Sequence, residues 1–163
     1  MVDTLRQATI AITQLILATA AHSQSMTTSY SCVAEFAGGG SYNSFTKHWE
    51  GSSINLNSDS SQFILRVTHL GSRIDKKLSF PRQFDNYNVS ITLSGSKYSL
   101  DCKENDNSKV VSTQFGIIKC NAVFDFVYNT ATGRFVQVSA FGYVRGSNDD
   151  TPYISGGTCT KIE

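Results

Sequence analysis

Apolar and polar residues alternate with a period of two along most of the chain after residue 25. Every second side chain is apolar in residues 30–36 and 87–93, and large aromatic side chains share one face in residues 122–128. Such alternation predicts half-buried antiparallel strands. The same reading predicts further strands at 45–50, 62–70, 110–114, 116–120, 134–145 and 155–161.

Turn-forming residues separate these segments. Loops are predicted at 38–41 and 57–61, a tight turn at 94–97, and a hairpin loop at 129–133 that ends in Gly133. Ser72 is a candidate N-cap for one short helix through Lys77, which Pro81 would end. Many short strands between turns predict an all-β fold, a single antiparallel β-barrel of the lipocalin or a similar small kind. A sandwich is the second choice, and the short helix stays an open alternative.

Residues 1–25 have a different character. Arg6 gives a weakly positive start, residues 8–21 are largely apolar, and the run ends in small side chains such as Ala18 and Ala20. This order is typical of a secretory signal peptide, and the apolar run is shorter than the roughly 20 residues that span a membrane. An amphipathic helix belonging to the fold is the alternative. We expect a signal peptide at 1–25, a β-domain at 26–163, and a periplasmic or secreted bacterial protein.

The cysteine count agrees with export. Cys32, Cys102, Cys120 and Cys159 all lie in the predicted β-domain. An even number of cysteines in an exported chain indicates disulfides, and no C-x-x-C pair indicates zinc or redox chemistry. Three pairings are possible. We favour Cys102–Cys120, which closes a local loop, and Cys32–Cys159, which ties the first strand to the last.

Composition narrows the function classes. The chain has 163 residues, with 14 Lys plus Arg against 13 Asp plus Glu and a net charge of +1. This length favours one domain, and the balanced charge argues against nucleic-acid binding. Ten Phe, seven Tyr and one Trp provide a core and argue against a disordered chain.

No motif indicates catalysis. There is no G-x-S-x-G sequence, and after export only His48 and His69 remain as histidines. With Glu50 they lack the spacing of a metal site. We therefore predict no catalytic residue, no metal and no cofactor.

Basic and aromatic residues supply two weaker candidates. Residues 66–82 contain five basic side chains and a single acidic one, Asp75. This local excess of positive charge predicts either a surface for an anionic partner or a solvated loop. These five are Arg66, Arg73, Lys76, Lys77 and Arg82. Three aromatic residues of 122–128 are predicted to pair with Phe135, Phe141 and Tyr143 across a hairpin, as core or as the wall of a ligand cavity.

Two resemblances rest on short motifs. Tyr30-Ser31-Cys32, residues 87–92 and residues 156–160 resemble segments of small exported proteins of unknown function from soil α-proteobacteria. Tyr30-Ser31-Cys32 and the turn from Ser94 to Tyr98 are also similar to the Y-x-C opening and S-G-x-x-Y turn of the membrane-bound C-type lysozyme inhibitors, which are small periplasmic β-barrels. That resemblance implies partner contacts at Ser94 and Tyr98. The Lys-Gly motif of that family is missing here, and two cysteines are additional.

The sequence thus predicts an exported, non-catalytic binding protein. Its ligand is unknown, and a small apolar molecule inside the β-barrel is the first hypothesis. The alternative is a module that binds an envelope protein, including a hydrolase inhibitor of the lysozyme type. An enzyme of unknown class is the third hypothesis. No nucleic acid and no membrane span are predicted.

Overall fold

The computed structural model describes residues 25–56, 61–76, 80–104, 108–146, 148 and 151–162. Within these residues the chain forms one sheet of ten antiparallel strands and one short helix. The elements are β1 Met26–Asn43, β2 His48–Ser53, β3 Gln62–Asp75, β4 Arg82–Leu93, β5 Leu100–Asp101, β6 Val110–Thr113, β7 Ile117–Asn121, β8 Asp125–Asn129, β9 Arg134–Ser139, α1 Phe141–Val144 and β10 Tyr153–Lys161. The predicted all-β antiparallel class is confirmed.

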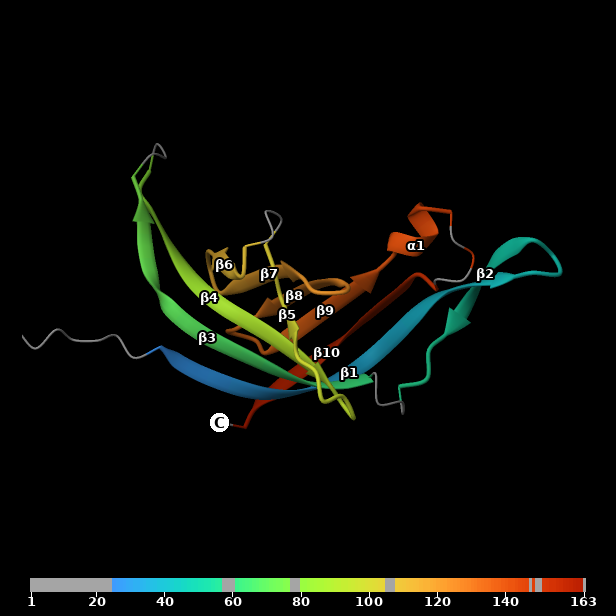
Figure 1. Cartoon of the computed structure of the whole chain (residues 1–163), viewed down its shortest axis with the longest axis horizontal. Coiled ribbons are helices and arrows are strands. Elements are labelled where there is room, and N and C mark those ends of the chain that lie inside the picture. The colour runs from blue at the N-terminus through green and yellow to red at the C-terminus, as the bar shows by residue number, and fades with distance from the viewer. Residues whose placement is uncertain are drawn as a thin grey trace, which may run out of the picture.

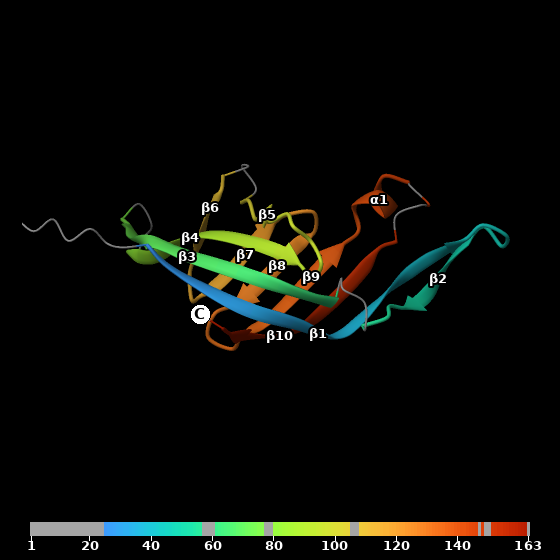
Figure 2. The same cartoon turned by 60° about the horizontal axis from the view of Figure 1, so that its bottom comes forward.

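The sheet is strongly curled but open. Its strands follow the order β5-β4-β3-β1-β10-β9-β8-β7, with β2 paired to β1 and β6 paired to β4. No ladder joins β5 to β7 in the described part of the chain, so a barrel is not shown. Figure 2 shows β3 and β4 crossing in front of β7, β8 and β9. The edges meet where Lys103 and Asn121 exchange two backbone hydrogen bonds, each 2.8 Å long.

The inner face of the curled sheet holds the core. Side chains at every second position of the strands are buried there, as the alternation predicts. The ring of Phe63 lies 4.9 Å from that of Phe135 and 5.9 Å from that of Phe126. Tyr128 is 1% exposed, and its ring centroid lies 5.6 Å from that of Tyr30. The middle of the interior is therefore filled by aromatic side chains.

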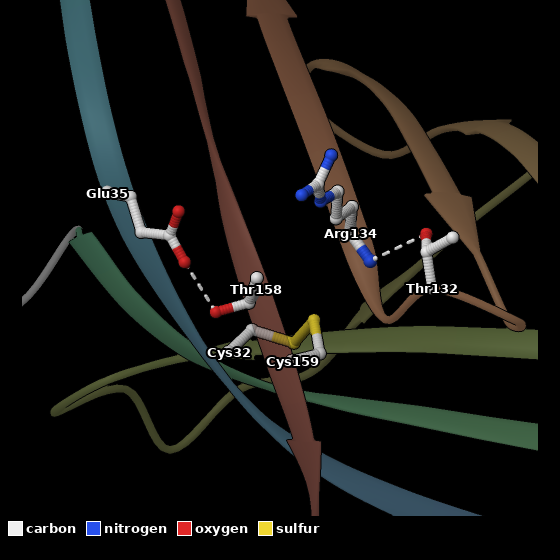
Figure 3. Close-up of a disulfide and its surroundings, with 6 residues drawn as sticks. All are labelled: Cys32, Glu35, Thr132, Arg134, Thr158 and Cys159. Atoms are coloured by element: carbon white, nitrogen blue, oxygen red, sulfur yellow. Dashed lines mark hydrogen bonds between the residues drawn. A yellow bond between two sulfur atoms is a disulfide. The ribbon is translucent and has the colours of Figure 1, made fainter.

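Two disulfides tie the sheet together, in the pairing that the cysteine spacing favours. Cys32–Cys159 joins directly opposite residues of β1 and β10, as Figure 3 shows. Beside it, the Thr158 hydroxyl donates a 2.6 Å hydrogen bond to Glu35 across the same strands. Cys102–Cys120 joins the segment after β5 to β7, at the place where the edges of the sheet meet.

The glycine run at 38–41 lies within β1, so the loop predicted there is wrong. Gly39 pairs with Tyr153 of β10 on one side and with Ser52 of β2 on the other. A Cβ atom on Gly39 would lie 2.4 Å from the Pro152 carbonyl oxygen, so only glycine permits this approach of the two backbones. Past this point β1 and β2 form a two-stranded arm that extends from the body of the sheet (Figure 1).

The strand predicted at 45–50 starts later, because a turn occupies the tip of this arm. The Asn43 side-chain oxygen accepts hydrogen bonds from the backbone N–H groups of Phe45 and Thr46, at 3.0 and 3.1 Å. This side chain thereby competes with the strand ladder for the backbone donors. Phe45 is 94% exposed at the tip, and β2 begins at His48.

The short helix predicted from Ser72 is also wrong. β3 stays extended to Asp75 because β4 offers a continuous partner, and Ser72 lies opposite Asp85. A bulge between His69 and Gly71, with Gly71 at φ 120°, shifts the register of this ladder. Lys77 lies outside the described residues.

The strand predicted at 134–145 ends at Ser139, because β10 provides no ladder partner beyond the pair Tyr153–Ser139. The chain then forms α1, where Phe141 and Tyr143 are 65% and 49% exposed. The predicted aromatic pairing across the hairpin holds for Phe135, which lies opposite Tyr128, and is wrong for the two helix residues.

The predicted signal segment lies almost wholly outside the described residues, which begin at Ser25. In the part that the structure describes, no helix has the length and apolar character needed to cross a membrane.

Candidate ligand-binding site

Among the described residues, two clefts border the filled middle of the interior, toward opposite ends of the inner face. We name them the Gln137 pocket and the His69 cleft. The Gln137 pocket is lined by Ala34, Ala37, Ile54, Asn55, Leu56, Ser61, Gln137, Thr151, Tyr153 and Ser155. The His69 cleft is lined by Met26, Thr28, Tyr30, Val67, His69, Asp85, Tyr87 and Thr130.

Small side chains on neighbouring strands create the Gln137 pocket. Ala37, Ser155 and Gln137 form one row across β1, β10 and β9. In the adjacent row Ala34 lies opposite Gly157, where an added Cβ atom would lie 2.0 Å from a backbone oxygen. Because these positions carry little volume, the sheet leaves a space of about 320 Å³.

The pocket holds two buried polar side chains on neighbouring strands. Gln137 is 5% exposed and Ser155 is 4% exposed, and they are direct partners in the β9–β10 ladder. Among the described residues, neither Gln137 Oε1 nor Ser155 Oγ has a hydrogen-bond partner. A buried polar atom without a partner costs about 1–3 kcal/mol, so such atoms call for an explanation.

The rest of the described lining is uncharged. The segment 54–56 lines the pocket, and the Ser61 hydroxyl donates a hydrogen bond to the carbonyl oxygen of Leu56 at the end of this segment. Burial raises the pKa of the Tyr153 phenol, which therefore stays neutral at physiological pH. The pocket can accept an apolar body and one uncharged hydrogen-bonding group, whereas an ion would lose its hydration without compensation.

The His69 cleft contains a charged group. His69 Nε2 lies 3.9 Å from Asp85 Oδ1, and the rings of His69 and Tyr87 are 5.2 Å apart. Ser72 Oγ and Gln83 Nε2 both donate to the Asp85 carboxylate. The hydrogen bond from Ser72 holds the pKa of Asp85 below its ordinary value.

The histidines and Glu50 considered for metal binding do not come together. His48 and Glu50 lie on β2 in the arm, whereas His69 lies on the inner face of β3. Within the described ranges, no three His, Cys, Asp or Glu side chains are close enough to hold a metal ion.

The predicted basic patch is divided in the structure. Arg66 lies on the outer face of β3 in a cleft shared with Asp101 and Lys109. Arg73 lies seven residues further along β3, about 23 Å away in an extended strand, and stacks on Phe84 at 5.5 Å. The exposed Lys76 and Arg82 are near Arg73, at the end of the β3–β4 ladder. A patch of all five residues therefore does not form.

The turn at Ser94 is present as predicted. Gly95 has φ 73°, the Ser96 N–H donates to the Leu93 carbonyl at 3.0 Å, and the Tyr98 N–H donates to Ser96 Oγ at 3.1 Å. Ser94 is exposed, and Tyr98 is 80% exposed.

Sequence reasoning missed Gln137 and Ser155. A signal was present, because Gln137 is two residues from Phe135 and so shares its buried face. Comparisons with protein-family models, curated proteins and solved structures give no match to this chain. The case for a ligand site therefore depends on geometry alone.

Proposed function

We propose that the protein is an exported, non-catalytic binding protein that holds a small, uncharged, amphipathic molecule in the Gln137 pocket. One observation carries this proposal: two neighbouring buried side chains, Gln137 and Ser155, each have a polar atom without a partner among the described residues, in a pocket whose described lining is uncharged. A ligand with a hydroxyl or amide group would supply the missing hydrogen bonds, and its apolar part would contact the alanine, isoleucine and leucine side chains.

The pocket volume limits the ligand size. At about 30 Å³ for each water-sized group, a space of about 320 Å³ holds about ten non-hydrogen atoms. With an intermediate ligand efficiency of about 0.7 kcal/mol per atom, binding would amount to about 7 kcal/mol, or a Kd near 10 μM. The proposed ligand is therefore a short-chain or single-ring alcohol or amide.

The test uses 1-octanol and octanoate as probes of matched size. We expect octanol to shift the backbone amide NMR signals of Gln137 and Ser155 in a saturable titration with a micromolar Kd. Octanoate should bind at least tenfold more weakly, because no cationic side chain is among the described residues that line the pocket. The absence of saturable shifts with octanol, or equal binding of octanoate, would contradict the proposal.

A matched pair of variants assigns the binding to this pocket. Gln137→Met should weaken octanol binding three- to tenfold, since one hydrogen bond contributes about 0.5–1.5 kcal/mol. Gln62→Met changes an exposed glutamine on β3 and should leave octanol binding unchanged. Equal loss in both variants would mean that the shifts do not report on this pocket.

Export and sheet closure belong to the same proposal. Two disulfides with no free cysteine among the described residues fit an oxidising compartment. The Lys103–Asn121 bridge and the neighbouring disulfide support a barrel-like closure in solution. Fractionation of cells that express the full chain tests export: a shortened, thiol-free form should appear outside the cytoplasm, and an intact cytoplasmic form with free thiols would contradict it.

A second candidate is a protein-binding role at the Ser94 turn. The observation in its favour is that a hydrogen-bonded turn displays Tyr98 at 80% exposure, and pre-organised aromatic side chains are frequent anchors in interfaces. The similarity to lysozyme inhibitors gives the assay. Excess protein should slow the hydrolysis of bacterial cell walls by lysozyme, and Tyr98→Ala should abolish that effect. Unchanged lysozyme activity would dismiss this candidate.

A further inference from the structure

We propose that the His69 cleft, at the opposite end of the interior, is a second binding site that takes a small organic ammonium ion. The cleft has a volume of about 370 Å³, enough for about twelve non-hydrogen atoms. This inference is independent of the Gln137 pocket, because the two clefts share none of the lining residues that the structure describes.

The His69 cleft contains a carboxylate that can bind a cation. Asp85 is the carboxylate of the cleft, its side chain is 31% exposed, and no lysine or arginine belongs to the described lining. Hydrogen bonds from Ser72 and Gln83 fix the carboxylate in one orientation. When His69 is neutral, a fixed, partly desolvated carboxylate without lysine or arginine in the described lining attracts cations and repels anions.

Two tyrosine rings line the cleft beside this carboxylate. Tyr30 and Tyr87 are half-buried side chains of the lining, and Tyr87 is held by the His69 ring at 5.2 Å. Tyr30 is in turn packed on Tyr128, with ring centroids 5.6 Å apart. Tyrosine rings beside a carboxylate are the arrangement that recognises alkylated ammonium groups, through cation–π attraction and charge together.

The cleft suits a metal ion less well. Metal sites are usually built on several His, Cys, Asp or Glu side chains, and the described residues hold no cluster of three of these. The half-buried rings instead offer apolar surface to methyl or methylene groups. An organic ammonium ion satisfies both the carboxylate and the rings.

The test compares choline with 3,3-dimethyl-1-butanol, which has the same shape without the charge. Titrations are made at pH 8, where histidine side chains are ordinarily neutral. Choline should produce saturable NMR shifts at Asp85 and Tyr87, and the neutral analogue should bind at least tenfold more weakly. Absent choline shifts, or equal binding of the two probes, would overturn the proposal without the need for any variant.

Two variants locate the charge. Asp85→Asn should weaken choline binding about tenfold and leave the neutral analogue unaffected. Asp101→Asn is the matched control, since Asp101 lies outside the cleft and pairs with Lys109 at 2.7 Å, and it should bind choline normally. A loss below threefold in Asp85→Asn, or an equal loss in both variants, would refute the assignment. Unchanged backbone amide NMR signals of core residues away from the cleft, such as Phe63 and Phe135, show that each variant is folded, and this readout does not depend on ligand binding in the Gln137 pocket.

Discussion

Replacing Gln137 by methionine should stabilise the unliganded protein while it weakens ligand binding. The side chain is 5% exposed, and its Oε1 atom has no partner among the described residues. Methionine has the same unbranched length and no polar group, so it fills the position without demanding a hydrogen bond. The substitution therefore separates what the fold needs at this position from what a ligand would need.

The magnitude follows from the burial of the amide. An unsatisfied buried polar group costs about 1–3 kcal/mol, and imperfect repacking around the methionine thioether offsets part of the gain. We expect the free energy of unfolding to rise by about 1 kcal/mol. In a domain of this length that corresponds to a rise in Tm of about 2–5 °C.

Urea unfolding and calorimetry of the oxidised protein measure this change. Gln62→Met, on the exposed side of β3, is the control and should change stability by less than about 0.5 kcal/mol. A loss of 1 kcal/mol or more in Gln137→Met would refute the reasoning, because it would show that the glutamine amide is satisfied and supports the fold. The site would then lose the observation on which the proposed function depends.

Three further changes test the fold. Removing Cys32–Cys159, whose cysteines are 127 residues apart, should lower the free energy of unfolding by about 5 kcal/mol in a urea titration. Removing Cys102–Cys120, whose cysteines are 18 residues apart, should lower it by about 3 kcal/mol. The reverse order would contradict the chain-entropy account. Gly39→Ala should lower the free energy of unfolding by at least about 2 kcal/mol, because the added Cβ would meet the Pro152 carbonyl oxygen. Gly38→Ala, where nothing lies within 4 Å of the added Cβ, should lower it by less than about 1 kcal/mol. Similar losses in the two variants would contradict a steric role for Gly39. Ser72→Ala should raise the pKa of Asp85 toward its ordinary value in a carboxyl NMR titration. Because that pKa is lowered in the folded state, Asp85 stabilises the fold above about pH 4 and loses this contribution as the pH falls through the folded pKa. The free energy of unfolding of Ser72→Ala should therefore fall less steeply below about pH 4 than that of the unmodified protein.

The parts of the fold that the sequence predicts are those that local alternation determines. Phe126 and Tyr128 repeat with a period of two, and both are buried, at 1% exposure each. The favoured disulfide pairing follows from an equally simple idea, that the first and last strands are neighbours, and β1 does pair with β10.

The parts that the sequence does not predict depend on distant partners. A glycine run is typical of a loop, and only the approach of the Pro152 carbonyl explains why Gly39 lies in a strand. Ser72 has the local pattern of a helix cap, yet a ladder partner in β4 keeps it extended. Curling and closure of the sheet depend on such long-range pairing, which residue spacing does not encode.

The candidate site is likewise only partly predictable from the sequence. The inward position of Gln137 is readable from its spacing to Phe135, but its encounter with Ser155 depends on the register of β9 against β10. Asp85 and Ser72 meet only because the bulge at Gly71 shifts the β3–β4 register. Composition marks none of these residues, since serine and glutamine are ordinary on a strand surface.

The packed middle of the interior limits the size and shape of any molecule that the two clefts can hold. A hollow barrel holds one ligand along its axis, whereas the rings around Phe63 divide this interior into two short clefts. The long strand β1 contributes to both, through Tyr30 at one end and Ala34 at the other. Between them, Cys32 fixes β1 to β10 through its disulfide, so the register that forms each cleft is held at a common point. Rigid walls of this kind favour small ligands that fit a preformed space over long chains that would need the core to open.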